Sequence, residues 1–432
     1  MNLSKTLTLS VLALVTATTL NAQTKVYITG STAFRSAALN GILHIYDASP
    51  PVQFGFTGTS FGGSNQAIFQ GNIGGVATNV YTSWSGSEAG IQTVANATQN
   101  VNFLPDGTAV SVSPGSSGAA TGTDPHHPDV AFSDTFQSTS QFNGTFGGVT
   151  YATLTESPGT SSGHGSPVGV VVFKWCANNG APFSNITSQL ARALYPAGKL
   201  PLALFTGANA DESKVVVAMG RNPDSGTRLT TFAESGLGAL RTVKQFQPQD
   251  STGALVKTTS GTISKFVPWP SEVINGVNVS VFNSGYSSGG DLSKAMRAVT
   301  TDPVSIQIGP NTTSYAAANL TRVAYLGTSD ADANLLNAGS PSPGVELSYN
   351  GVLLGNVAGN YNNVTALTEG QYTFWGYEHV LYNGSTIAAA VQTVADTLDT
   401  QLHDVDAPVL LSNMKVSRNT DGTTVTNTYA TP

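Results

Sequence analysis

Residues 220–232 read GRNPDSGTRLTTF, and this stretch decides how the rest of the chain is interpreted. A β-branched run precedes it, and the residues after Ser225 are capable of forming a helix. The order strand, Gly/Ser/Thr turn and helix start exposes unpaired backbone N–H groups at the positive end of a helix dipole. Arg221 adds a planar guanidinium that can grip an oxyanion through two parallel hydrogen bonds. The stretch therefore favours a seat for a small oxyanion, although a surface ion pair between Arg221 and Asp224 explains the local pattern equally well.

Two further places follow the same order of strand, small polar turn and helix start, at 30–36 and 85–90. A single instance is weak, since Ser and Thr are also the commonest helix N-caps. Three instances together with an arginine favour a shared anion site. Asp134, at the end of the strand predicted over 128–136, fits such a site as an acceptor for the proton of a protonated oxyanion, and it would repel a fully ionised one.

Composition limits the class of protein. The chain has 432 residues with 40% apolar and only 10% charged residues, and a formal net charge of −7. This length suits two or three domains, and the low charge is typical of secreted proteins with Ser-, Thr- and Asn-rich surfaces. With no basic stripe, nucleic acids and anionic membranes are not expected partners.

The first 22 residues predict a secretory signal peptide cleaved after Ala22, with one lysine and a short apolar run. This apolar run is too short for a membrane span, and we expect none in the mature chain. The single cysteine, Cys176, is expected to be a buried small residue, and the predicted signal peptide has no cysteine for a lipid anchor. The expected location is therefore periplasmic or secreted.

Strand-like and helix-like segments alternate along the chain, which indicates an α/β architecture. Strands are expected over 25–30, 128–136, 167–175 and 214–221. Helices are expected after these turns, after "SSGGD", and, with Ser184 as N-cap, over the segment that follows the 167–175 strand. The longest helix is expected within 385–405. No metal or cofactor site is predicted: a solvated loop explains His126 and His127 better than a metal does.

The ordered set TGSTAF, GSEAGIQTV, FSDTF and GRNPDSGTR resembles the phosphate-binding protein of ABC-type phosphate importers, which has the type II periplasmic-binding-protein fold. The resemblance extends over most of 25–400. It implies two α/β lobes with the ligand between them, residues 23–165 plus 366–432 forming one lobe and 166–365 the other. It also implies a binding protein without catalytic residues, and an importer membrane complex as partner.

The resemblance assigns the ligand contacts residue by residue. Arg221 is the clamp, and Asp134 accepts the phosphate proton. The implied donors are Ser31 or Thr32 in the first turn, Ser87 in the second, and Ser225, Gly226 and Thr227 at the third helix start.

Three departures from the family pattern stand beside these contacts. Ala33 replaces a threonine, Glu88 stands where the family has Ser or Gly, and Pro223 replaces an aspartate. Arg35 could replace the donor lost at Ala33, or could be an exposed helix residue. Ala33 and Glu88, together with the low charge and the long Ser/Thr/Gly-rich loops, favour a second hypothesis, a secreted or cell-surface protein that reuses the fold with a weakened anion site. A phosphatase-like hydrolase is a third, less favoured interpretation.

Overall fold

A computed structural model describes residues 23–157, 167–278, 283–337, 339–355 and 364–427. The predicted signal peptide lies outside the described residues. Within them, no helix combines the length and the apolar character needed to cross a membrane.

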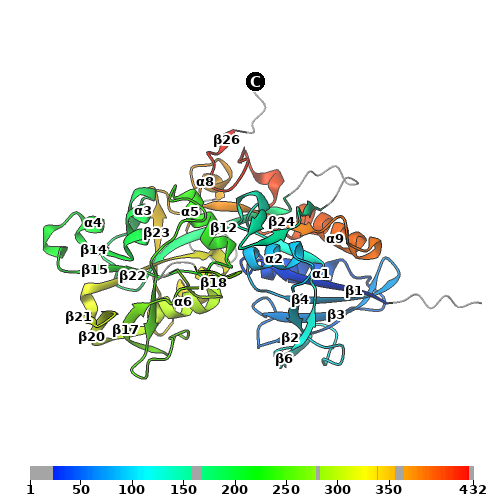
Figure 1. Cartoon of the computed structure of the whole chain (residues 1–432), viewed down its shortest axis with the longest axis horizontal. Helices are drawn as coiled ribbons and strands as arrows, with labels where there is room; N and C mark the ends of the chain where they lie inside the picture. Colours follow the sequence, from blue (N-terminus) through cyan, green and yellow to red (C-terminus); the bar gives the residue numbers. More distant parts are fainter. Residues whose placement is uncertain (1–22, 158–166, 279–282, 338, 356–363, 428–432) are drawn as a thin grey trace, which may run out of the picture.

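Two lobes lie side by side, joined near the middle of the molecule (Figure 1). A mixed sheet runs through both, and its strand order is β14-β15-β22-β12-β24-β8-β1-β4-β3-β2-β6. The bounds are β14 Lys199–Pro201, β15 Val215–Ala218, β22 Leu320–Gly327, β12 Gly169–Ala177, β24 Trp375–Tyr382, β8 Val130–Ser133, β1 Thr24–Gly30, β4 Val76–Ser83, β3 Gln66–Ile73, β2 Gln53–Thr57 and β6 Ser116–Ala119. This confirms the two-lobed α/β architecture expected from the sequence.

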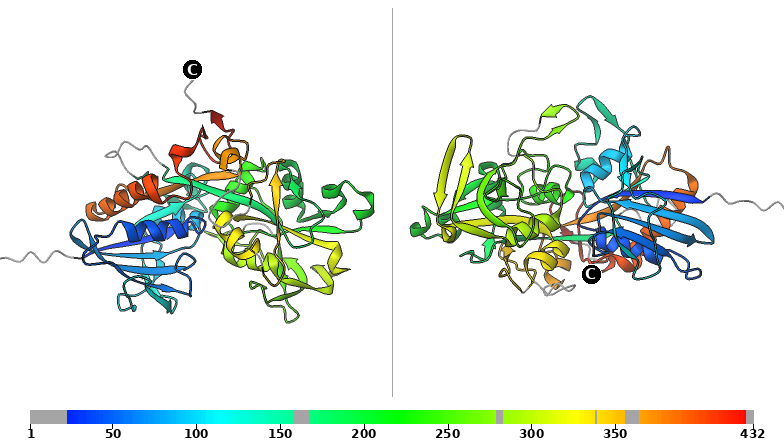
Figure 2. Two further views of the ribbon diagram at one scale, coloured as in Figure 1. Left: turned by 180° about the vertical axis from the view of Figure 1, so that it is seen from behind. Right: turned by 90° about the horizontal axis from the view of Figure 1, so that it is seen from below.

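The strand β12 joins the lobes. Its residues 169–172 pair antiparallel with β24, and its residues 173–177 pair antiparallel with β22. All nine residues of β12 are buried, as expected for a β-branched run covered on both faces. Figure 2 shows the strand crossing from one lobe to the other in the view from behind.

Helices cover the sheet and begin at the small polar turns. Their bounds are α1 Arg35–His44, α2 Ser87–Ala95, α3 Ser188–Ala197, α4 Ala203–Thr206, α5 Gly226–Glu234, α6 Gly289–Arg297, α7 Thr328–Asp330, α8 Val364–Thr368 and α9 Ala389–Gln401. With 13 residues, α9 is the longest helix described, as expected. The prediction of Ser184 as N-cap is wrong: Thr187 caps α3 by accepting a hydrogen bond from the Leu190 N–H, because the chain first forms the short strand β13 (Asn185–Ile186).

The second lobe carries an additional four-stranded sheet in the order β16-β17-β20-β21. Its strands are β16 Phe246–Gln249, β17 Thr262–Pro268, β20 Val299–Ile308 and β21 Asn311–Tyr315. Buried side chains such as Val217, Phe266 and Leu292 form one cluster between this sheet, α6 and the large sheet. The four-stranded sheet thus fixes α6 against the end of β22, where the second lobe meets the first.

Gly30 ends β1 at a point where a side chain has no room. Its φ is +118°, and a Cβ would lie 2.0 Å from the carbonyl oxygen of Phe132 on the neighbouring strand β8. Only glycine tolerates both the positive φ and the close approach. The turn that follows can therefore pass directly over the sheet edge and place Ser31 and Thr32 at the boundary between the lobes.

Candidate functional site

Arg221 lies at the boundary between the lobes, after β15 and before α5, and is only 2% exposed. Its Nε donates to the carbonyl oxygen of Tyr286 at 3.0 Å, and its Nη2 donates to that of Ser287 at 2.9 Å. The Arg221 N–H also donates to the Tyr325 hydroxyl at 3.1 Å. The guanidinium is therefore held in one orientation, and the surface ion pair with Asp224 is not observed.

The guanidinium also reaches the other lobe. Arg221 Nη2 donates to Thr32 Oγ1 at 3.2 Å, across the boundary from the turn after β1. Ser31 is used differently, since its Oγ accepts from the Phe34 N–H at 3.3 Å and stabilises the turn. Of the two residues considered from sequence, it is thus the Thr32 hydroxyl that lies at the arginine.

Asp134 is the centre of a closed hydrogen-bonded cluster and is 1% exposed. Ser87 Oγ donates to Asp134 Oδ1 at 2.5 Å, and Thr227 Oγ1 donates to Oδ2 at 3.2 Å. A Cβ on Gly226 would lie 1.6 Å from Asp134 Oδ1 and 2.7 Å from Ser87 Oγ. The absence of a side chain at Gly226 is what allows α5 of one lobe to approach the carboxylate of the other.

Burial raises the pKa of the Asp134 carboxyl, while the Ser87 hydrogen bond, the charge of Arg221 and the Thr227 hydrogen bond lower it. Hydroxyl donors and a nearby cation thus partly offset the desolvation of the carboxylate.

The N-termini of α2 and α5 meet head to head around this cluster. The Glu88 N–H donates to the carbonyl oxygen of Asp224 at 3.0 Å, which joins the two helix starts directly. Ser225 caps α5, its Oγ accepting from the Arg228 N–H at 3.3 Å. Two positive helix ends therefore face each other, an arrangement that a negative group between them stabilises. Asp134 is such a group.

Glu88 points away from Arg221. Its Oε1 accepts from Thr135 Oγ1 at 3.1 Å and its Oε2 from Ser140 Oγ at 2.7 Å. Burial is the main cause that raises the pKa of Glu88 to about 8. The first-turn glutamate that departs from the family pattern is thus enclosed in its own hydroxyl pocket and does not face the predicted ligand.

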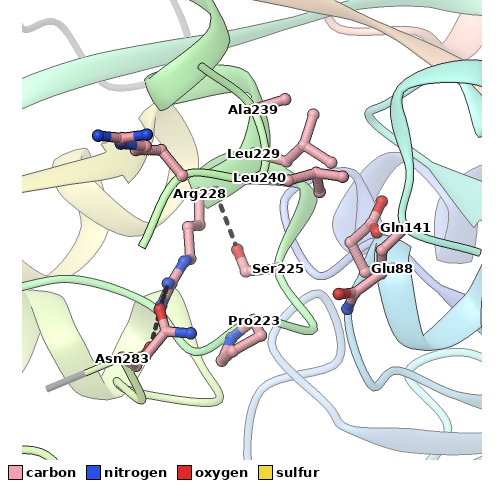
Figure 3. Close-up of a pocket in the computed structure, with 10 residues that line it drawn as sticks. Glu88, Gln141, Pro223, Ser225, Arg228, Leu229, Ala239, Leu240 and Asn283 are labelled. Carbon is pink, nitrogen blue, oxygen red and sulfur yellow. Dashed lines mark hydrogen bonds between the residues drawn. The ribbon is translucent and has the colours of Figure 1, made fainter. Parts of the chain in front are cut away.

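A small cavity of about 50 Å³ lies between Glu88 and the start of α5 (Figure 3). Arg228 crosses it and donates from Nη1 to the Arg221 carbonyl oxygen at 3.0 Å, and it also bonds the side chain of Asn283. This volume holds one or two water molecules at most. Arg228 therefore acts as a structural support behind Arg221.

A much larger cleft opens on the other side of Arg221, with a volume of about 510 Å³. Both lobes line it, and its charged and amide-bearing walls are Arg35, Asn65, Asp291, Lys294, Asp330 and Asn334. Arg35 is 6% exposed, so it is a buried wall residue and not an exposed helix arginine. The "SSGGD" turn before α6 is recognisable in the sequence. The contribution of Lys294 and Asp330 is not, because these residues lie 36 residues apart in the chain and come together only in the fold.

Other sequence candidates lie elsewhere. His126 stacks on Tyr27 with ring centroids 4.3 Å apart, and His127 Nδ1 lies 2.9 Å from the Gln99 carbonyl oxygen. In the described part of the chain, no group of three or more His, Cys, Asp or Glu residues is arranged to hold a metal. Cys176 is buried in β12, as expected.

Neither a comparison with family descriptions nor one with curated proteins finds a match. Solved structures similar to this chain include a protein described as a phosphate ABC transporter substrate-binding protein, with bound phosphate, from Clostridium perfringens. It has a TM-score of 0.41 and 11% identity, over 87% of this chain and 92% of that one.

Two further solved structures are similar. An ABC-type phosphate transport receptor from Vibrio cholerae has a TM-score of 0.40 and 10% identity, over 88% of this chain and 96% of that one. A phosphate-binding protein from Stenotrophomonas maltophilia has a TM-score of 0.33 and 12% identity, over 87% and 90% of the two chains. Such low scores give no information on the ligand.

Proposed function

We propose that this chain is an exported solute-binding protein that captures an oxyanion between its lobes, with inorganic phosphate as the simplest ligand. An ABC importer would receive the ligand, and the protein would act in the periplasm or after secretion, without catalysis. In this proposal residues 23–165 and 366–432 form one lobe, 166–365 form the other, and residues 1–22 are the cleaved signal peptide.

The observation that carries the proposal is the Arg221–Thr32 hydrogen bond between the lobes. A guanidinium has five N–H donors, and the hydrogen bonds of Arg221 in the described structure use only its Nε and Nη2. Nη1 remains for a ligand, next to the N-terminus of α6: it lies 3.4 Å from where a Cβ on Gly289 would stand. An oxyanion there would contact both lobes and stabilise their closed arrangement.

Asp134 would set the specificity. Each of its oxygens accepts one hydroxyl, and a carboxylate has about four lone-pair sites, so capacity remains for a proton from the ligand. Monohydrogen phosphate can supply such a proton, whereas sulfate cannot. Ser87, Ser225, Gly226 and Thr227 are assigned to this site as the groups that hold Asp134 and the start of α5.

Calorimetric titration of the purified protein with phosphate and with sulfate tests the proposal. We expect micromolar or tighter phosphate binding and no sulfate response. Arg221→Gln should weaken phosphate binding roughly 10- to 100-fold, since hydrogen bonds to a charged group contribute about 1.5–3 kcal/mol. Arg192→Gln is the matched control, because Arg192 lies exposed on α3 and lines none of the cavities beside Arg221.

One observation favours the second hypothesis, a surface protein with a weakened site. The hydroxyls of Ser87 and Thr227 are already bonded to Asp134, and a second carboxylate, Asp330, lies close enough to Arg221 to stabilise its charge. A folded protein that binds neither phosphate nor sulfate would support this alternative.

A further inference from the structure

The large cleft beside Arg221 is lined by charged side chains whose hydrogen bonds within the described residues are incomplete. Arg35 donates from Nη1 to Asn65 Oδ1 at 2.8 Å, but its buried Nε has no hydrogen-bond partner among the described residues. The side chain of Asp330, 9% exposed, accepts no hydrogen bond from the part of the chain that the structure describes. Such groups are costly when desolvated alone, and a ligand that bonds to them removes the cost.

The charges around Asp330 are mostly positive. The charges of Arg35, Arg221 and Lys294 lower the pKa of its carboxyl, and the charge of Asp291 raises it. No ion pair closer than 4 Å joins these groups in the described structure, which leaves space for a ligand among them. Two cations, Arg35 and Lys294, and two carboxylates, Asp291 and Asp330, line one space, and the Arg221 guanidinium lies behind it. Such a set suits a ligand that carries an anionic group together with hydroxyls. The cations bind the anionic group, and the carboxylates accept from the hydroxyls.

A second cavity of about 430 Å³ adjoins the first. The two share six lining residues: Thr32, Thr57, Gly58, Gly63, Asn65 and Ser288. Its wall includes Trp84, which is 6% exposed and whose Nε1–H has no hydrogen-bond partner among the described residues. The remaining wall is almost entirely uncharged. It is formed by hydroxyl, amide and glycine groups: Thr57, Gly58, Gly63, Gln66, Ser83, Ser85, Thr121 and Ser287. Neutral donors and acceptors of this kind match a hydroxylated carbon skeleton.

The cleft is larger than inorganic phosphate alone would fill. A cleft of about 510 Å³ falls within the range of roughly 300–1,000 Å³ found for sites that enclose small organic molecules. Inorganic phosphate is only slightly larger than a few water molecules, each of which occupies about 30 Å³ of liquid volume. Most of the cleft and its unpaired groups would remain in water beside bare phosphate.

We propose that the captured solute is a phosphate monoester of a sugar or polyol. Its phosphoryl group lies at Arg35, Lys294 and Arg221, and its hydroxyls bond to Asp330, Asn334 and the cavity beside Trp84. This inference rests on the proposed oxyanion capture and replaces bare phosphate by a larger member of the same class.

Calorimetric titration with glucose 6-phosphate, inorganic phosphate and glucose separates this inference from the proposed function. We expect glucose 6-phosphate to bind at least about tenfold more tightly than phosphate, from the additional hydrogen bonds, and glucose to give no measurable binding. Phosphate binding equal to or tighter than that of glucose 6-phosphate would overturn the inference and leave oxyanion capture intact. If neither phosphate compound binds, both proposals fail.

Two substitutions probe the two ends of the ligand. Trp84→Phe keeps an aromatic side chain but removes the pyrrole ring with its Nε1–H, so it should weaken glucose 6-phosphate binding about fivefold and leave inorganic phosphate binding unchanged. Trp269→Phe is the control, since Trp269 is also buried with an unpaired Nε1 but lies outside both cavities. Unchanged glucose 6-phosphate binding by Trp84→Phe would contradict the position of the hydroxyls.

Lys294→Gln should weaken glucose 6-phosphate and inorganic phosphate alike, by roughly tenfold, because it removes a cation from the phosphoryl end. Lys257→Gln, at an exposed lysine outside the cleft, should change neither. If Lys294→Gln leaves both affinities unchanged, the phosphoryl group does not lie where it is placed here.

Discussion

Asp134 and Asp330 are two buried carboxylates on either side of Arg221, and their surroundings differ. Asp134 accepts hydroxyl hydrogen bonds from both lobes, and Gly226 approaches it so closely that no side chain fits between them. The Asp330 side chain accepts no hydrogen bond from the described residues and opens into a 510 Å³ cleft. Burial raises the pKa of both carboxyls.

The difference indicates a division of roles around one arginine. The Asp134 carboxylate is bonded to hydroxyls of both lobes, so it holds the lobes together and retains acceptor capacity only for a single proton of a ligand. On the other side, the Asp330 carboxyl and Arg35 Nε have no hydrogen-bond partner among the described residues. A bound ligand would account for such unsatisfied groups. Three substitutions test this division.

Gly226→Ala should have the largest effect, because its Cβ would overlap Asp134 Oδ1. Either α5 moves away from Asp134 or the carboxylate leaves its hydroxyl donors. Overpacking of this kind costs about 3 kcal/mol or more of unfolding free energy. Chemical denaturation followed by circular dichroism measures the loss.

Gly107→Ala is the matched control, since Gly107 has open space around it and no positive φ. If Gly226→Ala is as stable as Gly107→Ala, the start of α5 does not lie in close contact with the Asp134 carboxylate.

Glu88→Gln, beside the hydrogen-bonded cluster around Asp134, should change how the free energy of unfolding depends on pH. Burial raises the pKa of Glu88 to about 8, so between pH 4.5 and 8 the folded state holds a proton that the unfolded state has released. Stability from this group is complete below about pH 4.5 and is lost as pH rises through about 8. Glu88→Gln removes this loss and should be more stable than the parent at pH 9 by about 2 kcal/mol or more, but similar to it at pH 5.

Asp134 and Asp421 also act on the Glu88 carboxyl, so thermal unfolding should be followed across the whole pH range. Glu212→Gln, at an exposed glutamate, serves as the control and should leave the pH profile unchanged. A parallel shift of stability at all pH values in Glu88→Gln would contradict burial as the cause of the raised pKa.

Asp330→Asn should have the smallest but most discriminating effect. It removes a negative charge beside Arg35 and Arg221 and should tighten inorganic phosphate binding by about tenfold, or about 1.4 kcal/mol. Asp134→Asn should weaken phosphate binding instead, because an amide accepts less well than a carboxylate. Calorimetry on both variants gives the comparison, and equal effects of the two substitutions would remove the distinction between the two sides.

The turns and helix starts of the site could be predicted from the sequence because short-range sequence signals determine them. A small polar turn after a β-branched run begins a helix in each of α1, α2 and α5, and these positions place Thr32, Ser87 and Ser225 at the lobe boundary. Arg221 was recognised from its neighbours alone. The donor in the first turn could be predicted only as Ser31 or Thr32, and the contact between Thr32 and Arg221 was not predicted, because the rotation of a turn is not encoded in its composition.

The open cleft could not be predicted, since its walls come from segments distant in the chain. Lys294 lies in α6 and Asp330 at the end of α7, and both meet Arg35 only when the two lobes are adjacent. The direction of the Glu88 side chain could not be predicted for a similar reason. The Thr135 and Ser140 hydroxyls that turn it away belong to a loop that has no recognisable motif.

The strand β12 has a consequence for how the protein can vary over evolutionary time. It pairs with β24 through residues 169–172 and with β22 through residues 173–177, so one run of nine residues sets the register on both sides. Side chains alternate between the faces of a strand, and a slip by one residue exchanges the faces. An insertion or deletion inside β12 would therefore disturb the cores of both lobes and rotate one lobe against the other. Length changes should be tolerated in the loops that decorate the lobes but excluded from this single strand.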